Sequence, residues 1–282
     1  MTSGDLVDSH HHLWDTDRLR YELFEEIPAL RRPYRARDYE AEATSLGVRR
    51  SICVEAASAR ADGRRETDWL LDEIEGSAVV AGLVAWAPLD SADVRDYLDW
   101  LVARPGVKPI VGVRRSFEFD DDDFPPSVAS GARVAGERGL VVDLVLFARS
   151  LPATLALVKR CPETQFVLDH LGKPDIRAGT FGPWADAVTE LASHPNVACK
   201  LSGLPNEAER THWTIADVRP YVEHAFSAFG SRRVLFGSDW PVIGLAGGFA
   251  RWFAAVQDLI QPLPEDDRRA VLGENAARIY GI

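Results

Sequence analysis

The chain has 282 residues, a length that fits one large barrel or two small domains. Hydrophobic residues make up 46% and charged residues 27%, which is typical of a well-packed globular protein, and no apolar run approaches the length of a membrane span. The formal charge of −11 argues against a nucleic-acid partner, because backbone phosphates are bound by basic surfaces, whereas an anionic small molecule needs only a local group of arginines.

The amino-terminal segment MTSGDLVDSHHHLWD lacks the basic start and long apolar stretch of a signal peptide, so we expect a cytoplasmic protein with no membrane partner. Cys53, Cys161 and Cys199 are odd in number and widely spaced, which indicates buried small hydrophobic residues rather than a disulfide framework. The acidic run at residues 120–123 lacks the spacing of a calcium loop and predicts a solvated loop.

Short runs of β-branched and apolar residues recur along the chain and predict eight strands. In chain order they are Leu6–Ser9, Ser51–Ala56, Val79–Ala87, Ile110–Phe117, Leu140–Phe147, Gln165–His170, Val197–Ser202 and Val234–Ser238. Their nearly continuous hydrophobicity is typical of parallel strands that are covered on their outer face.

A segment with helical spacing follows each of these runs. The predicted helices are Asp38–Leu46, Glu66–Ile74, Ala92–Val102, Ser127–Arg138, Leu151–Arg160, Pro183–Ala192, Ala216–Phe229 and Gly248–Ile260, with one more at Glu265–Tyr280. Thr214 and Asp217 have the spacing of a capping box at the start of the seventh.

Eight strand-then-helix units predict a (β/α)₈ barrel that forms a single domain over residues 1–282. The alternative is an open doubly wound sheet. Such a sheet normally has a glycine-rich phosphate turn after its first strand, and here that position holds three histidines.

Function in such a barrel lies at the carboxyl ends of the strands, so the residues that end each run are the candidate site. The first run ends in His10-His11-His12, and strand alternation puts His10 and His12 on one face with His11 on the other. Two imidazoles at this spacing can converge on one ion or one substrate oxygen. A purification-tag remnant is the alternative, but tags are longer.

The sixth and eighth runs also end in polar residues. His170 closes an apolar strand just before Gly172 and Pro174, and Asp239 follows the eighth strand. An ionised carboxylate at such a position costs free energy unless it is paired or used. A core histidine and a loop-capping aspartate are the alternatives.

The other strand ends offer further candidates for the same site. Glu55 is a candidate ligand or a salt-bridge partner. Arg114 or Arg115 should point inward, where a guanidinium suits a carboxylate or polyhydroxy substrate, or else forms a structural ion pair. Lys200 and Ser202 share one face of the seventh strand and are further candidates. Trp14 and Trp240 flank the predicted mouth, and core packing explains these two tryptophans equally well.

Five motifs occur in a familiar order along the whole chain: DSHHHLW from Asp8, DHLGKP from Asp169, CKLSG from Cys199, FGSDWP from Phe236 and GENAARIY from Gly273. Together they resemble the amidohydrolase-related family that contains sugar-acid lactonases, such as the L-fuconolactone and L-rhamnonolactone hydrolases, and the 2-pyrone-4,6-dicarboxylate lactonase. The resemblance implies a (β/α)₈ barrel that hydrolyses small lactones, with the functional positions falling on His10, His12, His170 and Asp239.

One departure from the wider superfamily concerns metal. Metal-dependent members usually have a histidine at the end of strand five, whereas Val141–Phe147 has none. The resemblance therefore implies one divalent ion or none. The predicted ion is zinc, with His10, His12, Asp239 and Glu55 as its ligand candidates and His170 as a further possibility.

These residues predict a mechanism for lactone opening. Asp239 would activate water, and the histidines or a metal ion would hold the carbonyl oxygen, with His170 among the catalytic groups. Arg114, Arg115, Lys200 and Trp240 are the predicted substrate-binding residues. The alternatives are a metal-dependent decarboxylase of an aromatic or unsaturated acid and a non-catalytic barrel that binds a sugar acid. The predicted partner is a small molecule, and assembly of identical chains stays open.

Overall fold

Eight parallel strands follow one another around a ring in the order β1-β2-β3-β4-β5-β6-β7-β8. The computed structural model describes residues 5–104, 108–118 and 124–282, so the acidic run at 120–123 lies outside the described residues. The strands are β1 Leu6–His12, β2 Val48–Val54, β3 Val80–Trp86, β4 Ile110–Ser116, β5 Val141–Val145, β6 Phe166–Leu168, β7 Val197–Leu201 and β8 Val234–Phe236.

The ring closes between β8 and β1 through the residues that carry the predicted site. His11 and Trp240 form a parallel bridge, the amide of His12 donates to Trp240 O at 2.7 Å, and the amide of Asp239 donates to His10 O at 2.8 Å. The predicted single-domain (β/α)₈ barrel is thereby confirmed.

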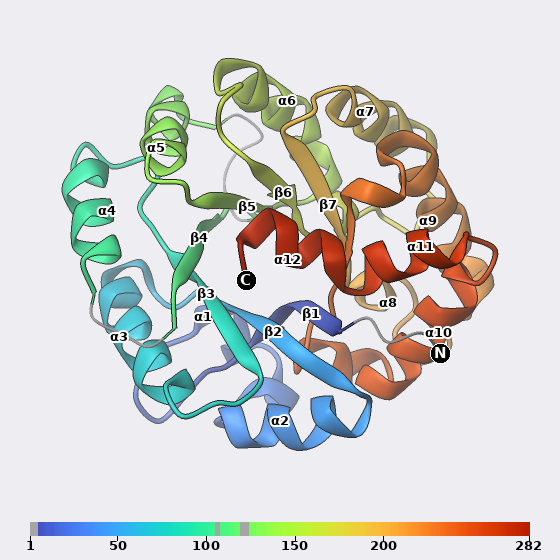
Figure 1. Ribbon diagram of the computed structural model, residues 1–282, viewed down its shortest axis with the longest axis horizontal. Helices are drawn as coiled ribbons and strands as arrows, with labels where there is room; N and C mark the ends of the chain where they lie inside the picture. The colour runs from blue at the N-terminus through green and yellow to red at the C-terminus, as the bar shows by residue number, and fades with distance from the viewer. Residues whose placement is uncertain (1–4, 105–107, 119–123) are drawn as a thin grey trace.

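Helices surround this ring in Figure 1, as expected when each strand is followed by a helix that covers the outer face of the sheet. They are α1 Glu22–Glu25, α2 Ala36–Ser45, α3 Gly63–Ile74, α4 Val94–Val102, α5 Pro126–Gly136, α6 Leu151–Arg160, α7 Gly182–Ala192, α8 Leu204–Glu207, α9 Ile215–Phe229, α10 Phe249–Ile260, α11 Glu265–Arg269 and α12 Asn275–Tyr280. None of the helices in the described part of the chain is both long and apolar enough to cross a membrane.

Most of the predicted elements lie within a few residues of their predicted positions, and α9 begins with the predicted capping box. The short helices α1 and α8 were not predicted, and β6 ends at Leu168 rather than at His170. The reason is the backbone of His170 and Leu171, whose φ angles of 54° and 53° end the strand in a left-handed turn.

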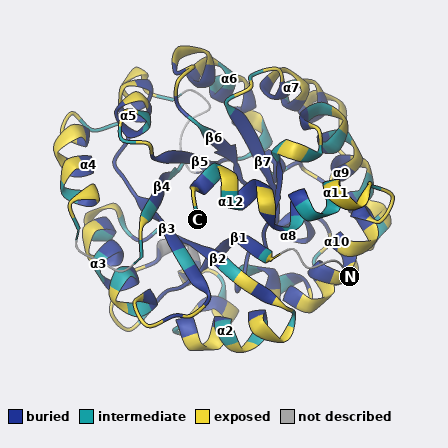
Figure 2. Ribbon diagram, in the orientation of Figure 1, coloured by how far each residue is buried: buried dark blue, intermediate teal, exposed yellow. Residues whose placement is uncertain are grey.

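Two hydrophobic layers stabilise the barrel. The larger lies between the strands and the surrounding helices, and Figure 2 shows the strands buried while the outer faces of the helices are exposed. The smaller fills the barrel interior with Val7, Ile52, Val54, Val84, Val111, Val141, Val167, Ala198 and Leu235, together with Ala276 and Tyr280 from α12.

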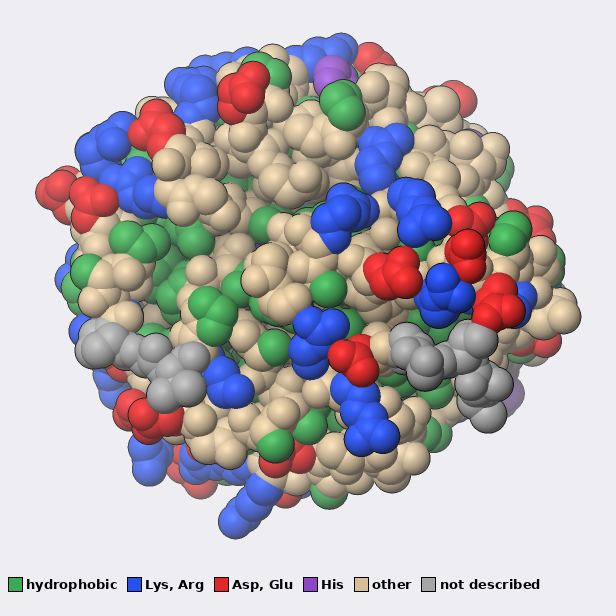
Figure 3. All heavy atoms as spheres, viewed as in Figure 1, with side chains coloured by type: hydrophobic (Ala, Val, Ile, Leu, Met, Phe, Trp, Pro, Cys, Tyr) green, Lys and Arg blue, Asp and Glu red, His purple; other side chains and the backbone are tan. Residues whose placement is uncertain are grey.

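The helix α12 lies across the middle of the ring in Figure 1, at the amino ends of the strands. The same face in Figure 3 shows acidic and basic side chains interspersed over the surface. This end of the barrel is therefore closed by the carboxyl-terminal helix, and the strand ends that carry the histidines lie at the opposite end.

Candidate active site

The structure brings together all four residues predicted to carry the chemistry. His10 and His12 lie in β1, His170 follows β6 and Asp239 follows β8. The Nε2 atoms of His10, His12 and His170 lie 3.9, 3.6 and 4.0 Å from Oδ1 of Asp239. The Nε2 atoms of His10 and His12 are 3.0 Å apart. Three imidazoles thus present the same ring nitrogen to one carboxylate.

Two of these four residues have an unusual backbone. His170 has a φ of 54° and Asp239 a φ of 60°, in the left-handed region that residues other than glycine seldom occupy. Each such residue costs about 1–3 kcal/mol and persists only where the surrounding structure holds it. Holding these two side chains toward the histidine cluster therefore lowers the stability of the barrel.

An irregularity in β1 brings the histidine pair to the inside of the barrel. Asp8 pairs with Ser51 of β2 but His11 pairs with Cys53, so β1 has one residue more than its partner between these positions. The extra residue changes the alternation of side chains. Val7 packs in the barrel interior, and His10 and His12 also face the interior although they differ from Val7 in parity.

The buried carboxylate of Asp8 fastens β1 to the segment that carries Asp239. Its Oδ1 accepts hydrogen bonds from the amides of Ser238 at 2.8 Å and His10 at 3.1 Å. Its Oδ2 accepts from Ser238 Oγ at 2.5 Å and from Tyr39 at 2.9 Å. Sequence analysis did not give Asp8 a role, although a carboxylate inside an apolar strand was a usable signal.

Each imidazole is oriented through its Nδ1 atom. His12 Nδ1 lies 2.9 Å from Val54 O, and His170 Nδ1 lies 2.9 Å from Ser202 Oγ. His10 Nδ1 lies 3.1 Å from Lys200 Nζ. Ser202, a predicted member of the site, therefore acts by orienting His170.

A layer of buried charges lies beneath the histidines. Arg114 donates to Glu55 Oε1 at 2.6 Å and to Asp169 Oδ2 at 3.1 Å. Lys200 pairs with Asp143 and lies 3.0 Å from Asp169 Oδ1. Sequence analysis missed Asp143 and Asp169 as partners, because the pairing depends on which strands become neighbours in the barrel.

Glu55, predicted as a metal ligand, lies apart from the histidine cluster. Its Oε1 accepts from Arg114, and its Oε2 accepts from the amide of Ala57 at 2.7 Å. Glu55 thus forms the salt bridge that was the alternative to a ligand role, and it is not part of the group of described residues that could hold a metal.

The predicted substrate-binding residues occupy different places. Arg114 points into the barrel as expected, whereas Arg115 lies over the ring of Phe117 with a terminal nitrogen 3.5 Å from Asp90. The indole of Trp240 donates to Glu42 at 2.8 Å and packs edge-on against the rings of Tyr34 and Tyr39. Lys200 is fully buried.

Burial sets the charge state of the cluster. It lowers the pKa of His10 well below its ordinary value, against the opposing pull of Asp169, and it lowers the pKa of His170 to about 4. Burial alone would raise the pKa of Asp239, but the interactions with His170 and His12 outweigh it, so this pKa falls below its usual value. At neutral pH, His10 and His170 are therefore neutral and Asp239 is ionised.

Comparison with known proteins identifies the family of this chain. A model of the amidohydrolase family matches residues 7–282. The chain belongs to the amidohydrolase family. Its L-fucono-1,5-lactonase relatives include one from Burkholderia ambifaria, 35% identical over 98% of this chain and 95% of the relative, and one from Burkholderia multivorans, 33% identical over 98% and 96%. The resemblance inferred from the five motifs is confirmed.

A solved amidohydrolase structure shows the same barrel. This structure, of a protein from Burkholderia multivorans with bound Zn, is 30% identical to the present chain and superposes on it with a TM-score of 0.89. The match covers 99% of each chain. In the amidohydrolase described here, the ligand atoms of His10, His170 and Asp239 all lie within 4.8 Å of one another. Two nitrogens and one carboxylate oxygen suit a single zinc ion, so this donor set fits a metal.

The carboxylate that β5 contributes to the barrel interior is bonded to other protein groups in this amidohydrolase. Asp143 of β5 pairs with Lys200 and accepts a hydrogen bond of 2.7 Å from the hydroxyl of Tyr280. Its carboxylate is fully buried beneath the cluster. Among the described residues, His10, His170 and Asp239 form the single group that could hold a metal.

Gly203 packs directly against the cluster and allows a test of its geometry. It has a φ of +65°, and a Cβ added there would lie 2.6 Å from His170 Nδ1 and 3.1 Å from Asp239 Oδ2. We expect Gly203→Ala to lower kcat roughly 10- to 100-fold, because His170 must move from its position. Steady-state kinetics on the substrate that the wild-type chain turns over best measures the loss.

Gly230 provides the matched control for this substitution. Its φ is +68°, but a Cβ added there would meet no atom within 4 Å. Gly230→Ala should therefore lower stability through the backbone alone and leave kcat unchanged. Equal kcat values for the two variants would contradict the tight packing of Gly203 against His170.

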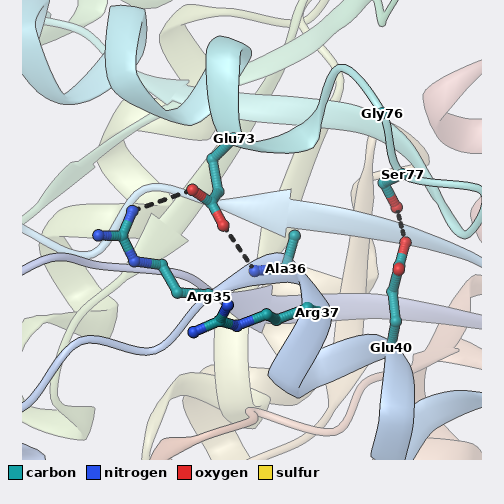
Figure 4. A pocket seen from close by; sticks show the side chains of 7 residues that line it. All are labelled: Arg35, Ala36, Arg37, Glu40, Glu73, Gly76 and Ser77. Atoms are coloured by element: carbon teal, nitrogen blue, oxygen red, sulfur yellow. Dashed lines mark hydrogen bonds and ion pairs between the residues drawn. The ribbon is translucent and has the colours of Figure 1, made fainter.

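A second hollow on the surface, lined by Arg35, Ala36, Arg37, Glu40, Glu73, Gly76 and Ser77, is separate from this site. Figure 4 shows Glu73 bonded both to Arg35 and to the amide of Ala36, at 3.0 Å each, and Ser77 bonded to Glu40. The carboxylates in this hollow thus join α2 to α3 and its surroundings, and none of the residues that line the hollow belongs to the histidine cluster.

Proposed function

We propose that this amidohydrolase opens a small sugar-acid lactone, of the fucono- or rhamnonolactone type, by adding water to the lactone carbonyl. The supporting observation is the ionised Asp239 carboxylate, which faces three histidine Nε2 atoms at 3.6–4.0 Å. The similarity to L-fucono-1,5-lactonases at 35% and 33% identity supports the substrate class.

In the proposed reaction, Asp239 takes a proton from water as the oxygen attacks the carbonyl carbon. Imidazole N–H groups stabilise the negative charge that develops on the carbonyl oxygen. The tetrahedral intermediate then collapses, the ring C–O bond breaks, and the proton held by Asp239 passes to the departing ring oxygen. The product is the open-chain hydroxy acid, and Asp239 is ionised again.

We expect at most one divalent ion, proposed to be zinc, held by His10, His170 and Asp239 with His12 beside them. Such an ion would act as a Lewis acid on the carbonyl oxygen. The remaining polar groups of the substrate are proposed to be hydroxyls. Arg114 is the candidate to bind them, since it donates to Asp169, the residue just before His170.

A panel of sugar lactones assayed with a pH indicator tests the proposal. A lactonase releases a proton from each acid formed, whereas a decarboxylase would release carbon dioxide, which a coupled assay detects. Turnover of at least one polyhydroxy lactone is the expected result. Binding of sugar acids without turnover would favour the non-catalytic alternative, and activity confined to apolar esters would contradict the substrate class.

The pH dependence of the reaction follows from the charge states of His170 and Asp239. Burial lowers the pKa of His170 to about 4, and the pKa of Asp239 is also lowered. His170 is therefore neutral above about pH 5 and takes up a proton as the pH falls through about 4, whereas Asp239, with its lowered pKa, stays ionised over this range. We expect kcat/KM to be level from about pH 5 upward and to fall on the acid side.

Initial rates between about pH 4 and 8, corrected with an enzyme-free blank for spontaneous hydrolysis, measure this profile. A fall in kcat/KM with its midpoint at about pH 6.5, the ordinary pKa of histidine, would contradict the expected profile. It would show that the histidine titrates as an exposed imidazole.

A further inference from the structure

The inner side of His10 contacts two oppositely charged groups that demand opposite tautomers. Lys200 Nζ forms a hydrogen bond with His10 Nδ1 at 3.1 Å. An ammonium group has donors only, so Nδ1 must accept this hydrogen bond and therefore carries no proton. With Nδ1 accepting from Lys200, Nε2 is the ring nitrogen of His10 that carries the proton, and it faces the site.

The contacts of His12 lead to the same assignment. Its Nδ1 lies 2.9 Å from Val54 O, and a carbonyl oxygen can only accept, so Nδ1 of His12 donates, and the single-proton tautomer that makes this contact has a bare Nε2. The Nε2 atoms of His10 and His12 are 3.0 Å apart, a distance that requires one proton between them when no metal ion is bound. His10 supplies that proton only as the Nε2–H tautomer.

Asp169 contacts His10 without fulfilling the role that the other tautomer would give it. Its Oδ1 lies 3.2 Å from His10 Nδ1 and 3.0 Å from Lys200 Nζ. Neither contact has the direction of a hydrogen bond, and this buried oxygen has no hydrogen-bond partner among the described residues. It is the acceptor that a protonated Nδ1 would use.

We propose that Lys200 is a positioning residue that fixes His10 in the Nε2–H tautomer, so that His10 is the member of the strand-one pair that donates a hydrogen bond to the substrate carbonyl. His12, whose Nε2 is bare, acts as an acceptor. The role in carbonyl polarisation rests on the proposed function, whereas the tautomer itself does not.

Lys200 is held in place from the far end of the barrel. Its Nζ pairs with Asp143 and lies 5.5 Å from the centre of the Tyr280 ring. The Tyr280 hydroxyl donates to Asp143 Oδ1 at 2.7 Å. Tyr280 of the carboxyl-terminal helix α12 therefore orients the Asp143 carboxylate, and Asp143 in turn orients the Lys200 ammonium group. A side chain at the closed end of the barrel is thus linked to His10 at the open end.

The tautomer also determines how the site responds to metal. A metal ligand needs a bare Nε2, so an ion at His10 requires the proton to move to Nδ1, where Asp169 Oδ1 would accept it. The hydrogen bond from Lys200 must break for that to occur. Lys200 and a metal ion bound at His10 thus oppose each other.

Nitrogen NMR of protein labelled with ¹⁵N-histidine, after removal of metal with a chelator, tests the proposal directly. The imidazole whose signals disappear in His10→Gln should have a protonated Nε2 and a bare Nδ1 in the wild-type chain. In the double variant Lys200→Met/Asp143→Asn, which removes the ion pair as a unit, the proton should move to Nδ1 and face Asp169.

Asp143→Asn is the matched control, because it keeps Lys200 beside His10 and should keep the Nε2–H tautomer. A bare Nε2 on wild-type His10, or an unchanged tautomer in the double variant, would overturn the proposal. If the double variant does not fold, the wild-type spectrum alone still decides, since the proposal requires the Nε2–H form there.

Zinc affinity gives a second readout that does not depend on catalysis. Competition with a chromophoric chelator should show Zn²⁺ bound about tenfold more tightly or better by the double variant than by Asp143→Asn, because no hydrogen bond to Nδ1 has to break. Equal affinities would contradict the opposition between Lys200 and metal. Absence of lactone turnover in the wild-type chain would reject the proposed function instead, and the NMR result would stand apart from it.

Discussion

Replacement of Asp239 by asparagine should lower kcat roughly 10²- to 10⁴-fold while the protein stays folded. The amide has nearly the shape of the carboxylate, so the hydrogen bond from Asn206 at 3.3 Å to the same position can be kept. It cannot take a proton from water, and general-base assistance is lost. Steady-state kinetics on the best lactone, with circular dichroism as a check on folding, measures the effect.

Asp175→Asn is the control for this substitution, since Asp175 is exposed and the new amide can still accept the hydrogen bond from Ala178. It should leave kcat unchanged. If Asp239→Asn retained close to full kcat, Asp239 would not be the base, and the water would have to be activated by another group.

Replacement of Arg114 by methionine should have the largest effect on stability. The guanidinium lies between Glu55 and Asp169, and all three side chains are buried. Asp169 retains Lys200 as a partner, but Glu55 loses its cation and becomes an unpaired charge in the barrel. Breaking a buried ion pair in this way costs about 3–5 kcal/mol.

A loss of this size is a large part of the roughly 5–15 kcal/mol that stabilises a folded protein. For a chain of this length it corresponds to a decrease in Tm on the order of 10 °C, which thermal unfolding followed by circular dichroism measures. Arg115→Met is the matched control. Because Arg115 is 3.5 Å from Asp90 at the edge of the barrel, we expect a loss of about 1 kcal/mol or less.

An unchanged Tm for Arg114→Met would mean that the loss of the guanidinium beside Glu55 is compensated at little cost, and the ion pair would then be unimportant for folding. A normal Tm together with a raised KM would instead favour the predicted contact between Arg114 and substrate. The two measurements therefore separate a structural role of Arg114 from a role in binding.

The sequence by itself determined the architecture and the membership of the central cluster. Hydrophobic runs of strand length alternate with helical spacing, and this local pattern is enough to predict eight parallel strands in one barrel. Parallel strands bring their carboxyl ends to one side, so His10, His12, His170 and Asp239 were predicted to meet there. The hydrophobic runs and the helical spacing between them are both properties of short segments, so they can be recognised without a structure.

The tertiary structure alone decided the partners of each charged side chain. Glu55 pairs with Arg114 instead of facing the histidines, Trp240 turns toward α2, and Lys200 contacts His10 from beneath. These contacts join strands that are far apart in sequence, and they depend on the register of the whole barrel.

The extra residue in β1 shows why such contacts cannot be derived from local pattern. Simple alternation would place Val7 and His10 on opposite faces, yet the register shift between Asp8 and His11 puts both inside the barrel. The shift is held by hydrogen bonds from Ser238 and Tyr39 to Asp8, which come from distant segments. A bulge of this kind is stable only when those segments are already in place, and so it is a property of the folded barrel rather than of the strand.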